Sequence, residues 1–393
     1  MVGKTTLGKR EWGLGERDTR REKKDLLSRL RLRILKRAKK VALKKNKEKT
    51  MRHEAVNLFF ACDERYLPLF GVALTSIKNH ADNHRAYRAV VLHTDISEKK
   101  AKEMCAVFAA ENFSVSFRNV SRELSLFRDR LHTRDYYTNA TYYRLLIPAL
   151  YPRMKKALYL DSDILLRADV AALFDTPLGD ALAAAVPDGF VNQVPVLRRY
   201  VENRVGVPAQ MPYFNAGVLL MNLVEMRKMA FGERFVSLLS RVTFRVAQDQ
   251  DYLNVLCRGR VKFLPATWNY MPFGYAEEAP ALVHFNLDMK PWQRDDIPYG
   301  EEFWACADAT PFGAELHAKR AAYSEADIRR AAEQTENLVR IAVSESEDGA
   351  ECRRVAERIR LVMKDAPAKS PVMRVREGRF VCRVKHAAAG GAL

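Results

Sequence analysis

The sequence predicts an α/β fold whose mainly parallel, twisted sheet is covered by helices on both faces. Short apolar segments alternate with helix-periodic segments over residues 56–117, in the order strand, helix, strand, helix, strand. Acidic residues directly follow two of the apolar segments of the chain, at Asp63 and at Asp161 and Asp163. Open sheets of this kind bind ligands beyond the carboxyl ends of their strands. The fold class therefore also predicts where the functional site lies.

The composition of the chain limits the kinds of protein that it can be. With 393 residues, of which 48% are hydrophobic, the chain can form a full core in one large domain with appendages. It has no run of about 18 apolar residues and no signal-peptide pattern at its N-terminus, so we expect a cytoplasmic protein without a membrane-spanning helix. The six cysteines form no C-x-x-C pair, which indicates reduced and mostly buried thiols: Cys62, Cys105, Cys257, Cys306, Cys352 and Cys382.

The positive charge is concentrated at the N-terminus. Residues 1–52 hold 20 Lys and Arg against 6 Asp and Glu, so 20 − 6 = +14 of the net +18 lies there. Within this arm, residues 25–47 predict a basic amphipathic helix, with an aliphatic stripe at Leu27, Leu30, Ile34, Ala38 and Val41. Such a helix suits an anionic membrane surface, which predicts a peripheral protein at the inner face of the plasma membrane. The alternative is a solvated basic arm or one that binds RNA non-specifically, and the scarcity of aromatic residues argues against specific nucleic-acid binding.

In the first half of the chain, the predicted strands and helices alternate regularly. Apolar runs predict the strands, apolar residues at helical spacing predict the helices, and Ser97 begins one helix in a position to cap it. The expected elements are a strand at 56–61, a helix at 67–80, a strand at 87–93, a helix at 97–111, a strand at 113–117, a helix at 136–150 and an extended segment at 157–166.

The second half of the chain is less regular. Gly217, at the centre of an apolar segment, indicates close approach of a ligand or a neighbouring strand. The expected elements are strands at 181–186, 213–223, 260–264 and 281–285, and helices at 231–241, after 248, at 302–318 and at 324–362 with a break near 344–349. The basic, Ala- and Gly-rich residues 365–393 predict a flexible tail.

Two D-x-D pairs are candidates for chemistry. In an extended chain residues i and i+2 point the same way, so Asp161 and Asp163 can face one divalent cation, while Ser162 faces away. The alternative is a strand end whose acids cap the next turn. The second pair, Asp249 and Asp251, precedes helix-periodic residues and is expected to cap that helix. The first pair is therefore the better metal candidate.

With these segments in order, residues 57–292 resemble glycosyltransferase family 8, which includes bacterial lipopolysaccharide galactosyl- and glucosyltransferases and is related to glycogenin. Six motifs in the right order carry the resemblance: Phe60-Ala61-Cys62-Asp63, Tyr143-Arg144-Leu145, Leu158-Tyr159-Leu160-Asp161-Ser162-Asp163, Phe214-Asn215-Ala216-Gly217-Val218, Gln248-Asp249-Gln250-Asp251, and His284-Phe285 with Lys290-Pro291-Trp292. The resemblance implies a GT-A type fold, a UDP-glucose or UDP-galactose donor, dependence on Mn²⁺ or Mg²⁺, and transfer with retention at the anomeric carbon.

The resemblance also assigns roles to residues. Asp161, Asp163 and His284 would be the metal ligands, a donor set that suits Mn²⁺. Lys290 would reach the diphosphate, with a solvated lysine as the alternative. Arg144 would contact the donor sugar or its phosphates, or else form a structural salt bridge. The remaining assignments are the uridine site, at Ala61, Cys62, Asp63 and Tyr66, and the sugar pocket, at Asp188, Asn215, Ala216, Asp249 and Gln250, with Ser162 beside the donor.

The resemblance does not decide the mechanism or the backbone contact to phosphate. The family position for a nucleophile falls on Gln250, whose amide is a poor one, so we favour front-face attack over a covalent intermediate on Gln250, Asp249 or Asp251. A Gly often stands three residues after the metal-binding His, where it lets the backbone approach phosphate, but this chain has Leu287 there. Cys62 stands where Asp or Ala is common.

The expected organisation is a basic arm at 1–52, a GT-A catalytic domain at 53–300, a helical extension at 301–364 and the tail. The expected reaction transfers a hexose to a glycan or glycolipid acceptor. This acceptor would be a cell-surface polysaccharide or a lipopolysaccharide. One alternative is a sugar-phosphate nucleotidyltransferase, although the loop after the first strand lacks the glycines typical of that class. The other is a non-catalytic scaffold at the membrane, in which nothing would require metal ligands.

Overall fold

The computed structural model describes residues 54–125, 128–132, 139–273 and 278–364. The chain divides into two compact units, residues 1–54 and 55–393, and the account below concerns the second. The predicted basic arm with its helix at 25–47, the start of the helix predicted at 136–150, and the predicted tail at 365–393 lie outside the described residues.

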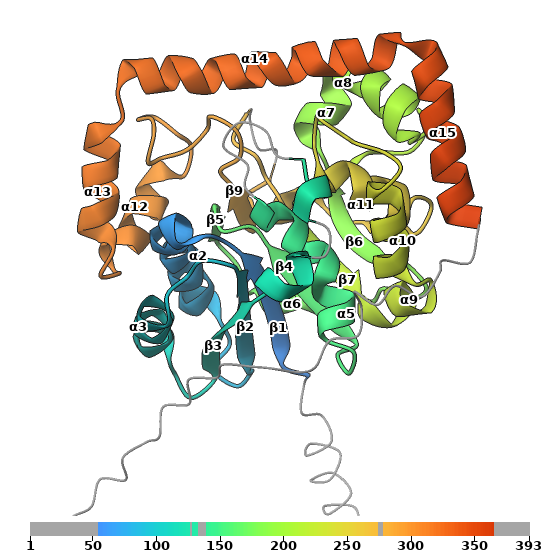
Figure 1. Cartoon of the computed structure of the whole chain (residues 1–393). Coiled ribbons are helices and arrows are strands. Elements are labelled where there is room, and N and C mark those ends of the chain that lie inside the picture. The colour runs from blue at the N-terminus through green and yellow to red at the C-terminus, as the bar shows by residue number, and fades with distance from the viewer. Residues whose placement is uncertain (1–53, 126–127, 133–138, 274–277, 365–393) are drawn as a thin grey trace, which may run out of the picture. The chain divides into compact units, whose positions relative to one another are not determined.

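The described residues form a seven-stranded sheet with the order β3-β2-β1-β4-β7-β6-β8 (Figure 1). Its strands are β1 (Val56–Ala61), β2 (Tyr87–His93), β3 (Phe113–Asn119), β4 (Lys156–Leu160), β6 (Ala183–Pro187), β7 (Phe214–Asn222) and β8 (Val261–Phe263). Strand β7 runs antiparallel to both neighbours, and all other pairings in the sheet are parallel. The prediction of a mainly parallel α/β sheet is therefore confirmed.

Both faces of this sheet are buried. In β1, Leu58 and Phe60 pack in one core, together with residues of the helices α2 (Leu67–His80) and α3 (Glu98–Phe108). Phe59 points to the opposite core. Because successive side chains of a strand alternate between faces, a strand covered on both sides must be apolar throughout. This explains why the central strands β1 and β4 read as nearly continuous apolar runs, whereas the edge strand β3 alternates between apolar and polar residues.

The segment predicted as one extended stretch at 157–166 is two strands in two sheets. Strand β4 ends at Leu160, and β5 (Ile164–Leu166) pairs antiparallel with β9 (Leu282–His284) in a separate two-stranded sheet. The chain bends between them, because the N–H of Asp161 donates to Gly217 of β7 while the carbonyl of Asp163 accepts from the N–H of Phe285. The two acids therefore converge through a bend, and the expectation that strand pleating aligns them is wrong.

The helix predicted at 136–150 also differs. The described part is a 3-10 helix, η3 (Asn139–Leu146), followed by the short α-helix α5 (Ile147–Leu150). Pro148 lacks an N–H and is tolerated only in the first turn of an α-helix, so a new helix begins there. Six of the eight residues of η3 are buried, which places Arg144 in the interior.

The other short helices connect the strands. Ser97 caps α3 as predicted, accepting from the N–H of Lys100. The remaining helices before residue 270 are η1 (Glu64–Tyr66), α4 (Ser121–Leu124), η2 (Arg128–Arg130), α6 (Val170–Phe174), α7 (Gly189–Gln193), α8 (Pro195–Tyr200), the π-helical η4 (Val201–Val205), α9 (Leu223–Lys228), α10 (Phe231–Leu239), α11 (Asp249–Cys257) and η5 (Ala266–Trp268).

The C-terminal part is a chain of four helices. The single helix predicted at 302–318 is instead α12 (Gly300–Asp308) and α13 (Gly313–Ala322), separated by a turn in which the hydroxyl of Thr310 accepts from the N–H of Phe312. The break predicted near 344–349 is confirmed, because Asp348 separates α14 (Glu325–Glu347) from α15 (Gly349–Lys364). In the described part of the chain, no helix has both the length and the apolar character needed to cross a membrane.

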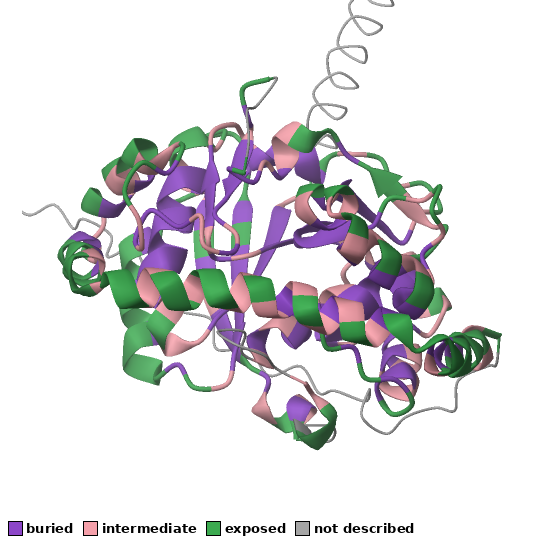
Figure 2. Ribbon diagram, turned by 90° about the horizontal axis from the view of Figure 1, so that it is seen from above, coloured by how far each residue is buried: buried purple, intermediate pink, exposed green. Residues whose placement is uncertain are grey.

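Helix α14 crosses over the side of the sheet where the site lies (Figures 1 and 2). The C-terminal part of α14 packs against the body of the protein through the buried residues Leu338, Ala342 and Ser346. A largely buried ion pair joins Arg204 of η4 to Glu345, with an N–O distance of 3.0 Å. The C-terminal part of α14 is thus anchored to the body of the protein.

Replacing Arg204 with Ala should destabilise this anchor. Glu345 would keep its buried position with only the exposed Arg245 as a partner, at a cost of about 3 kcal/mol in the free energy of unfolding. Urea denaturation measures the loss, and Arg353→Ala, at an exposed position of α15, is the matched control. Equal stability of the two variants would contradict an anchoring role for Arg204.

Candidate functional site

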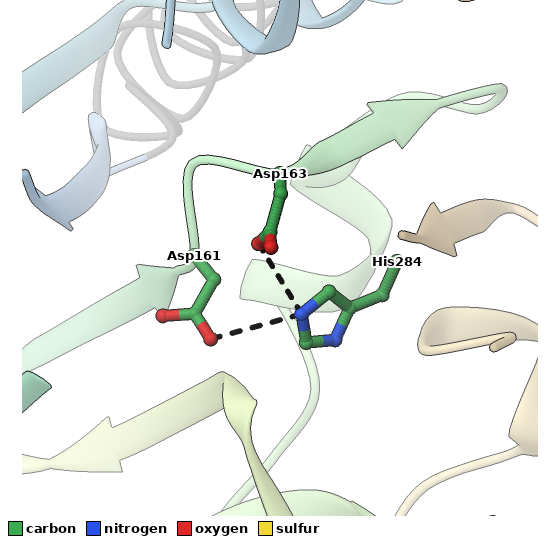
Figure 3. A group of neighbouring side chains, drawn as sticks. All are labelled: Asp161, Asp163 and His284. Atoms are coloured by element: carbon green, nitrogen blue, oxygen red, sulfur yellow. Dashed lines mark ion pairs between the residues drawn. The ribbon is translucent and has the colours of Figure 1, made fainter. Parts of the chain in front are cut away.

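Three side chains of metal-ligand type meet at the end of β4. Asp161 and Asp163 come from the bend after β4, and His284 comes from the end of β9 (Figure 3). The Nε2 atom of His284 lies 3.7 Å from Asp161 Oδ2 and 3.4 Å from Asp163 Oδ1. One ligand atom of each residue lies within 4.8 Å of the others. The structure therefore brings together the three predicted metal ligands from two distant segments.

A chain of hydrogen bonds fixes the imidazole of His284. The backbone N–H of Gly217 donates to Asn215 Oδ1 (2.9 Å), so the Asn215 amide nitrogen must face Asp188, to which it donates at 3.0 Å. Asn215 Oδ1 also accepts from Asn269 Nδ2 at 2.9 Å. Because the side-chain nitrogen of Asn269 donates to Asn215, its side-chain oxygen Oδ1 is the atom that accepts from His284 Nδ1, at 3.0 Å. Because Nδ1 carries the proton, the lone pair of Nε2 points at the two carboxylates.

Gly217 makes room for this arrangement. A Cβ atom at this position would lie 2.7 Å from Asp161 Oδ2 and 2.9 Å from His284 Nδ1. Both distances are far below van der Waals contact, and both neighbours are held by other partners. The close approach predicted for Gly217 is therefore confirmed, and the approaching groups are the side chains of two candidate ligands.

Two buried cations adjoin the triad. Lys290 Nζ donates to Asp163 Oδ2 at 2.7 Å and is 3% exposed, so the alternative of a solvated lysine is wrong. Arg144 lies 2.9 Å from Asp249 Oδ2 and 3.3 Å from Asp161 Oδ1, and its guanidinium covers the ring of Tyr159 at 4.3 Å. The salt bridge left open for Arg144 is thus present, and the same side chain also lines a cavity of the site.

The charges around the triad do not balance. Asp161, Asp163, Asp188 and Asp249 carry four negative charges when ionised, against two on Arg144 and Lys290. Burial opposes ionisation of Asp163, but Lys290 and His284 outweigh it and hold its pKa below the usual range. Burial raises the pKa of Asp249 to about 7, with Asp161 adding to the effect and Arg144 opposing it.

This set of groups fits a divalent cation. Two carboxylates and a neutral imidazole suit Mn²⁺, and also Mg²⁺ if further oxygen ligands come from a phosphate-bearing substrate. The excess of up to two negative charges matches the charge of such an ion. The hydrogen-bonded Nδ1 of His284 and the space kept by Gly217 provide the fixed ligand orientation that a metal site needs.

Two cavities, each of about 90 Å³, open on either side of the triad. Asp161 and His284 line both. The first cavity contains the predicted sugar-pocket residues Asp188, Asn215, Ala216, Asp249 and Gln250, together with Arg144. The second cavity contains the predicted uridine-site residues Ala61, Cys62, Asp63 and Tyr66, together with Ser162 and Asp163. Lys290 lines neither of these two cavities and reaches the triad through Asp163.

The second D-x-D pair does not cap its helix as expected. The residue before α11 is Gln248, and no side chain caps the N-terminus. Asp249 pairs with Arg144 instead. Asp251 is fully buried and accepts from the hydroxyls of Tyr200 (2.9 Å) and Tyr213 (2.7 Å), as well as from a backbone N–H just before the helix. Both acids lie in the first turn of α11, but Asp249 pairs with Arg144, and two buried tyrosine hydroxyls donate to Asp251.

Several residues of the site were missed from the sequence. Tyr159 donates to Asp161 Oδ1 at 2.8 Å, and its position two residues earlier on the same strand could have indicated this. Gln248 lines the first cavity with a buried amide and a positive φ of 49°; it belongs to one of the motifs of the resemblance, but the sequence assigned it no role. Asn269 and Leu338 reach the site from an irregular loop and from α14, which only the fold brings near.

Leu287 occupies the position where the family often has glycine. Its φ is +52°, in the left-handed region that glycine favours. The backbone therefore keeps the glycine-like conformation, with a leucine side chain added. The residue lines the first cavity, so its side chain takes up space there that a glycine would leave open.

Comparison with known proteins identifies relatives. The model of glycosyl transferase family 8 matches residues 57–296. The lipopolysaccharide 1,2-glucosyltransferase of Escherichia coli is 26% identical over 264 residues, which cover 61% of this chain and 74% of that protein. A protein of Haemophilus influenzae is 28% identical over 221 residues, which cover 56% of this chain and 64% of the relative.

Solved structures show the same arrangement of elements. The galactosyltransferase LgtC, crystallised with donor and acceptor sugar analogues, is 28% identical, with a TM-score of 0.57 over 67% of this chain and all of LgtC. The bifunctional glycosyltransferase WbbM is 25% identical, with a TM-score of 0.59 over 69% of this chain and 52% of WbbM. The chain thus spans less than two thirds of the Haemophilus relative and about half of WbbM.

Replacing Gly217 with Ala should impair metal binding. The added methyl group would displace Asp161 or His284, and we expect affinity for Mn²⁺ to fall by about 10- to 100-fold. Titration with Mn²⁺, followed by electron paramagnetic resonance, measures the affinity. Gly189→Ala is the matched control, because a Cβ there has no atom within 4 Å. Wild-type affinity in Gly217→Ala would show that the ion binds elsewhere.

Proposed function

The chain belongs to glycosyltransferase family 8, and from this premise we propose that it is a retaining, metal-dependent hexosyltransferase that uses UDP-glucose or UDP-galactose. The cluster of Asp161, Asp163 and His284 beside Lys290 carries the proposal. A diphosphate leaving group needs positive charge close to its oxygens, and this is where the chain holds both a cation site and a buried lysine. We propose Mn²⁺ as the ion, with Mg²⁺ as the alternative.

We propose that the two cavities hold the two ends of the donor. The second cavity takes the uridine, with Asp63 as the acceptor for its N–H or hydroxyl groups and Tyr66 at its edge. The first cavity takes the hexose, whose hydroxyls face Asp188, Asn215 and Gln250. The diphosphate then crosses the triad between the cavities, which places the bond to be broken next to the metal ligands.

Side chains of the protein would stabilise UDP as the leaving group. When bound, the metal ion supplies a Lewis acid that stabilises negative charge on the diphosphate. Lys290, held by Asp163 and by the carbonyl of Phe285, adds a second positive charge on the same side. Arg144 donates to the carbonyl of Ala216 and pairs with Asp249, which keeps the wall of the hexose cavity rigid. Positioning and electrostatic stabilisation therefore account for the proposed reaction.

We propose front-face attack for the retention of configuration. Asp251 is 0% exposed and shielded by two tyrosines, and it does not line the first cavity. Gln250 uses both ends of its amide, accepting from the N–H of Ala216 and donating to Asp188. Asp249 is engaged by Arg144. A glycosylated peptide containing any of these side chains, trapped and identified by mass spectrometry, would contradict front-face attack.

Two other functions were considered from the sequence. A sugar-phosphate nucleotidyltransferase would need a glycine-rich loop after β1, and residues 62–66 contain no glycine. A non-catalytic scaffold would not need the hydrogen-bonded orientation of His284 or the space at Gly217. Membership of family 8 also favours glycosyl transfer over both.

For the acceptor we propose a cell-surface glycan or glycolipid, such as the lipopolysaccharide core. The similarity to the lipopolysaccharide 1,2-glucosyltransferase of Escherichia coli supports this class. We further propose that residues 53–300 form the catalytic domain and 301–364 a helical extension. In this scheme the basic residues 1–52 hold the protein at the inner face of the plasma membrane, and residues 365–393 form a flexible tail.

The Asp163→Asn variant should release no UDP. Asn is a weaker ligand for a divalent cation and no longer forms an ion pair with Lys290. Release of UDP from UDP-glucose and UDP-galactose, measured with Mn²⁺ and after EDTA, should be lost in the variant and in EDTA. Asp180→Asn, at an exposed carboxylate, should keep full activity. Full activity of Asp163→Asn, or activity that survives EDTA, would overturn metal dependence.

Deleting residues 1–52 should abolish binding to anionic vesicles. The deletion removes +14 of charge and the predicted aliphatic stripe, and each Lys or Arg near such a surface contributes about 1 kcal/mol. Sedimentation with vesicles of phosphatidylglycerol and phosphatidylcholine, compared with phosphatidylcholine alone, measures the binding. UDP release by the truncated protein shows that it is folded. Continued sedimentation of the active truncated protein would refute the membrane arm.

A further inference from the structure

One face of α14 changes character along its length. The positions 327, 330, 331, 334, 338, 342 and 345 fall at helical spacing and so lie on one face. The C-terminal part of that face is packed on the body, through Leu338 and Ala342. The N-terminal part of the same face is polar, with Asp327, Arg330 and Gln334, and has no buried residue. A helix face that only needed to pack would continue as an apolar stripe.

The polar part of α14 lines a cavity of about 210 Å³. Loop residues 287–293 and η1 form the opposite wall. The polar and aromatic side chains that line it are Tyr66, Lys290, Gln293, Tyr323, Asp327, Arg330 and Gln334. We refer to this space as the α14 cavity.

The α14 cavity adjoins the proposed active site, and Lys290, which pairs with Asp163, is one of its lining residues. Leu287 lines both the α14 cavity and the hexose cavity, and Tyr66 lines both the α14 cavity and the uridine cavity. On α14 itself, Gln334 lines the α14 cavity, and Leu338, one turn later, lines the hexose cavity. A ligand in the α14 cavity would therefore lie next to the donor site, beneath the same helix.

We propose that the α14 cavity is a carbohydrate subsite that binds a hexose unit of the acceptor glycan next to the sugar that receives the donor. The proposal rests on the glycosyltransferase activity proposed above. The α14 helix would then complete the acceptor site, and the length of the acceptor, rather than only its terminal sugar, would affect its recognition.

The lining fits a neutral sugar better than an anion or an apolar ligand. Arg330 pairs with Asp327 at 3.0 Å, and the ammonium group of Lys290 is directed to Asp163 and the carbonyl of Phe285, so the lining offers no cluster of cations to an anion. Amide, guanidinium and carboxylate groups can each form hydrogen bonds with hydroxyl groups, and the tyrosine rings offer apolar faces to the C–H groups of a pyranose. Few polar groups of fixed position among aromatic rings are typical of specific small-ligand sites.

The test is saturation-transfer NMR on the full chain, with lactose and maltose as probes and with UDP and Mg²⁺ present to fill the donor site. Arg330→Ala/Gln334→Ala removes two donors from the α14 cavity, and we expect about a 10-fold loss of affinity for the disaccharide that binds. The control is Arg329→Ala/Glu333→Ala, at exposed positions one residue earlier on the helix. It should bind as the wild type does.

UDP release without acceptor separates this proposal from the proposed function. It should be equal in the three proteins, since neither pair of substitutions touches the donor cavities. Absence of UDP release in the wild type would overturn the transferase activity, whatever the sugar binding. No disaccharide binding by the wild type, or equal binding by Arg330→Ala/Gln334→Ala, would overturn the subsite. Loss of UDP release in that variant alone would assign the cavity to the donor and also overturn the subsite.

Discussion

The orientation of one imidazole ring is the constraint on which the rest of the site depends. His284 presents Nε2 to Asp161 and Asp163 because Asn269 accepts from its Nδ1, and Asn269 is held by Asn215. The orientation of Asn215 is set by a backbone donor at Gly217, the residue that also makes room for the ring. Strand β7 thus fixes a side chain that belongs to another sheet. A few hydrogen bonds from the central sheet are enough to give a bend and a loop the fixed geometry of a candidate cation site.

The site also concentrates negative charge that the protein itself does not neutralise. Arg144 and Lys290 are both buried, and each pairs with a carboxylate, so their side chains are held in place. Carboxylates held close together without enough cations repel one another, so the site favours a further cation. A divalent ion would balance the excess negative charge, which links the electrostatics of the site to the metal dependence proposed for this chain.

The sequence was informative where local chemistry and order along the chain decided the outcome. The mainly parallel sheet, the cap at Ser97, the break at Asp348 and the special role of Gly217 followed from composition, spacing and the residue types. The two-sheet arrangement around Asp161 did not, because it depends on hydrogen bonds to residues more than 50 positions away. The same applies to Asn269 and to α14, whose contributions arise only when distant segments meet. Asp251 was misjudged because burial, rather than its place near a helix end, determined its partners.

A crystal structure with UDP and Mn²⁺, with anomalous scattering at the manganese edge, tests the central claim most directly. The account predicts a single anomalous peak within coordination distance of Asp161, Asp163 and His284 Nε2, with the diphosphate oxygens completing the shell. A peak at any other group of residues, or clear density for UDP with no peak beside these three side chains, would contradict it.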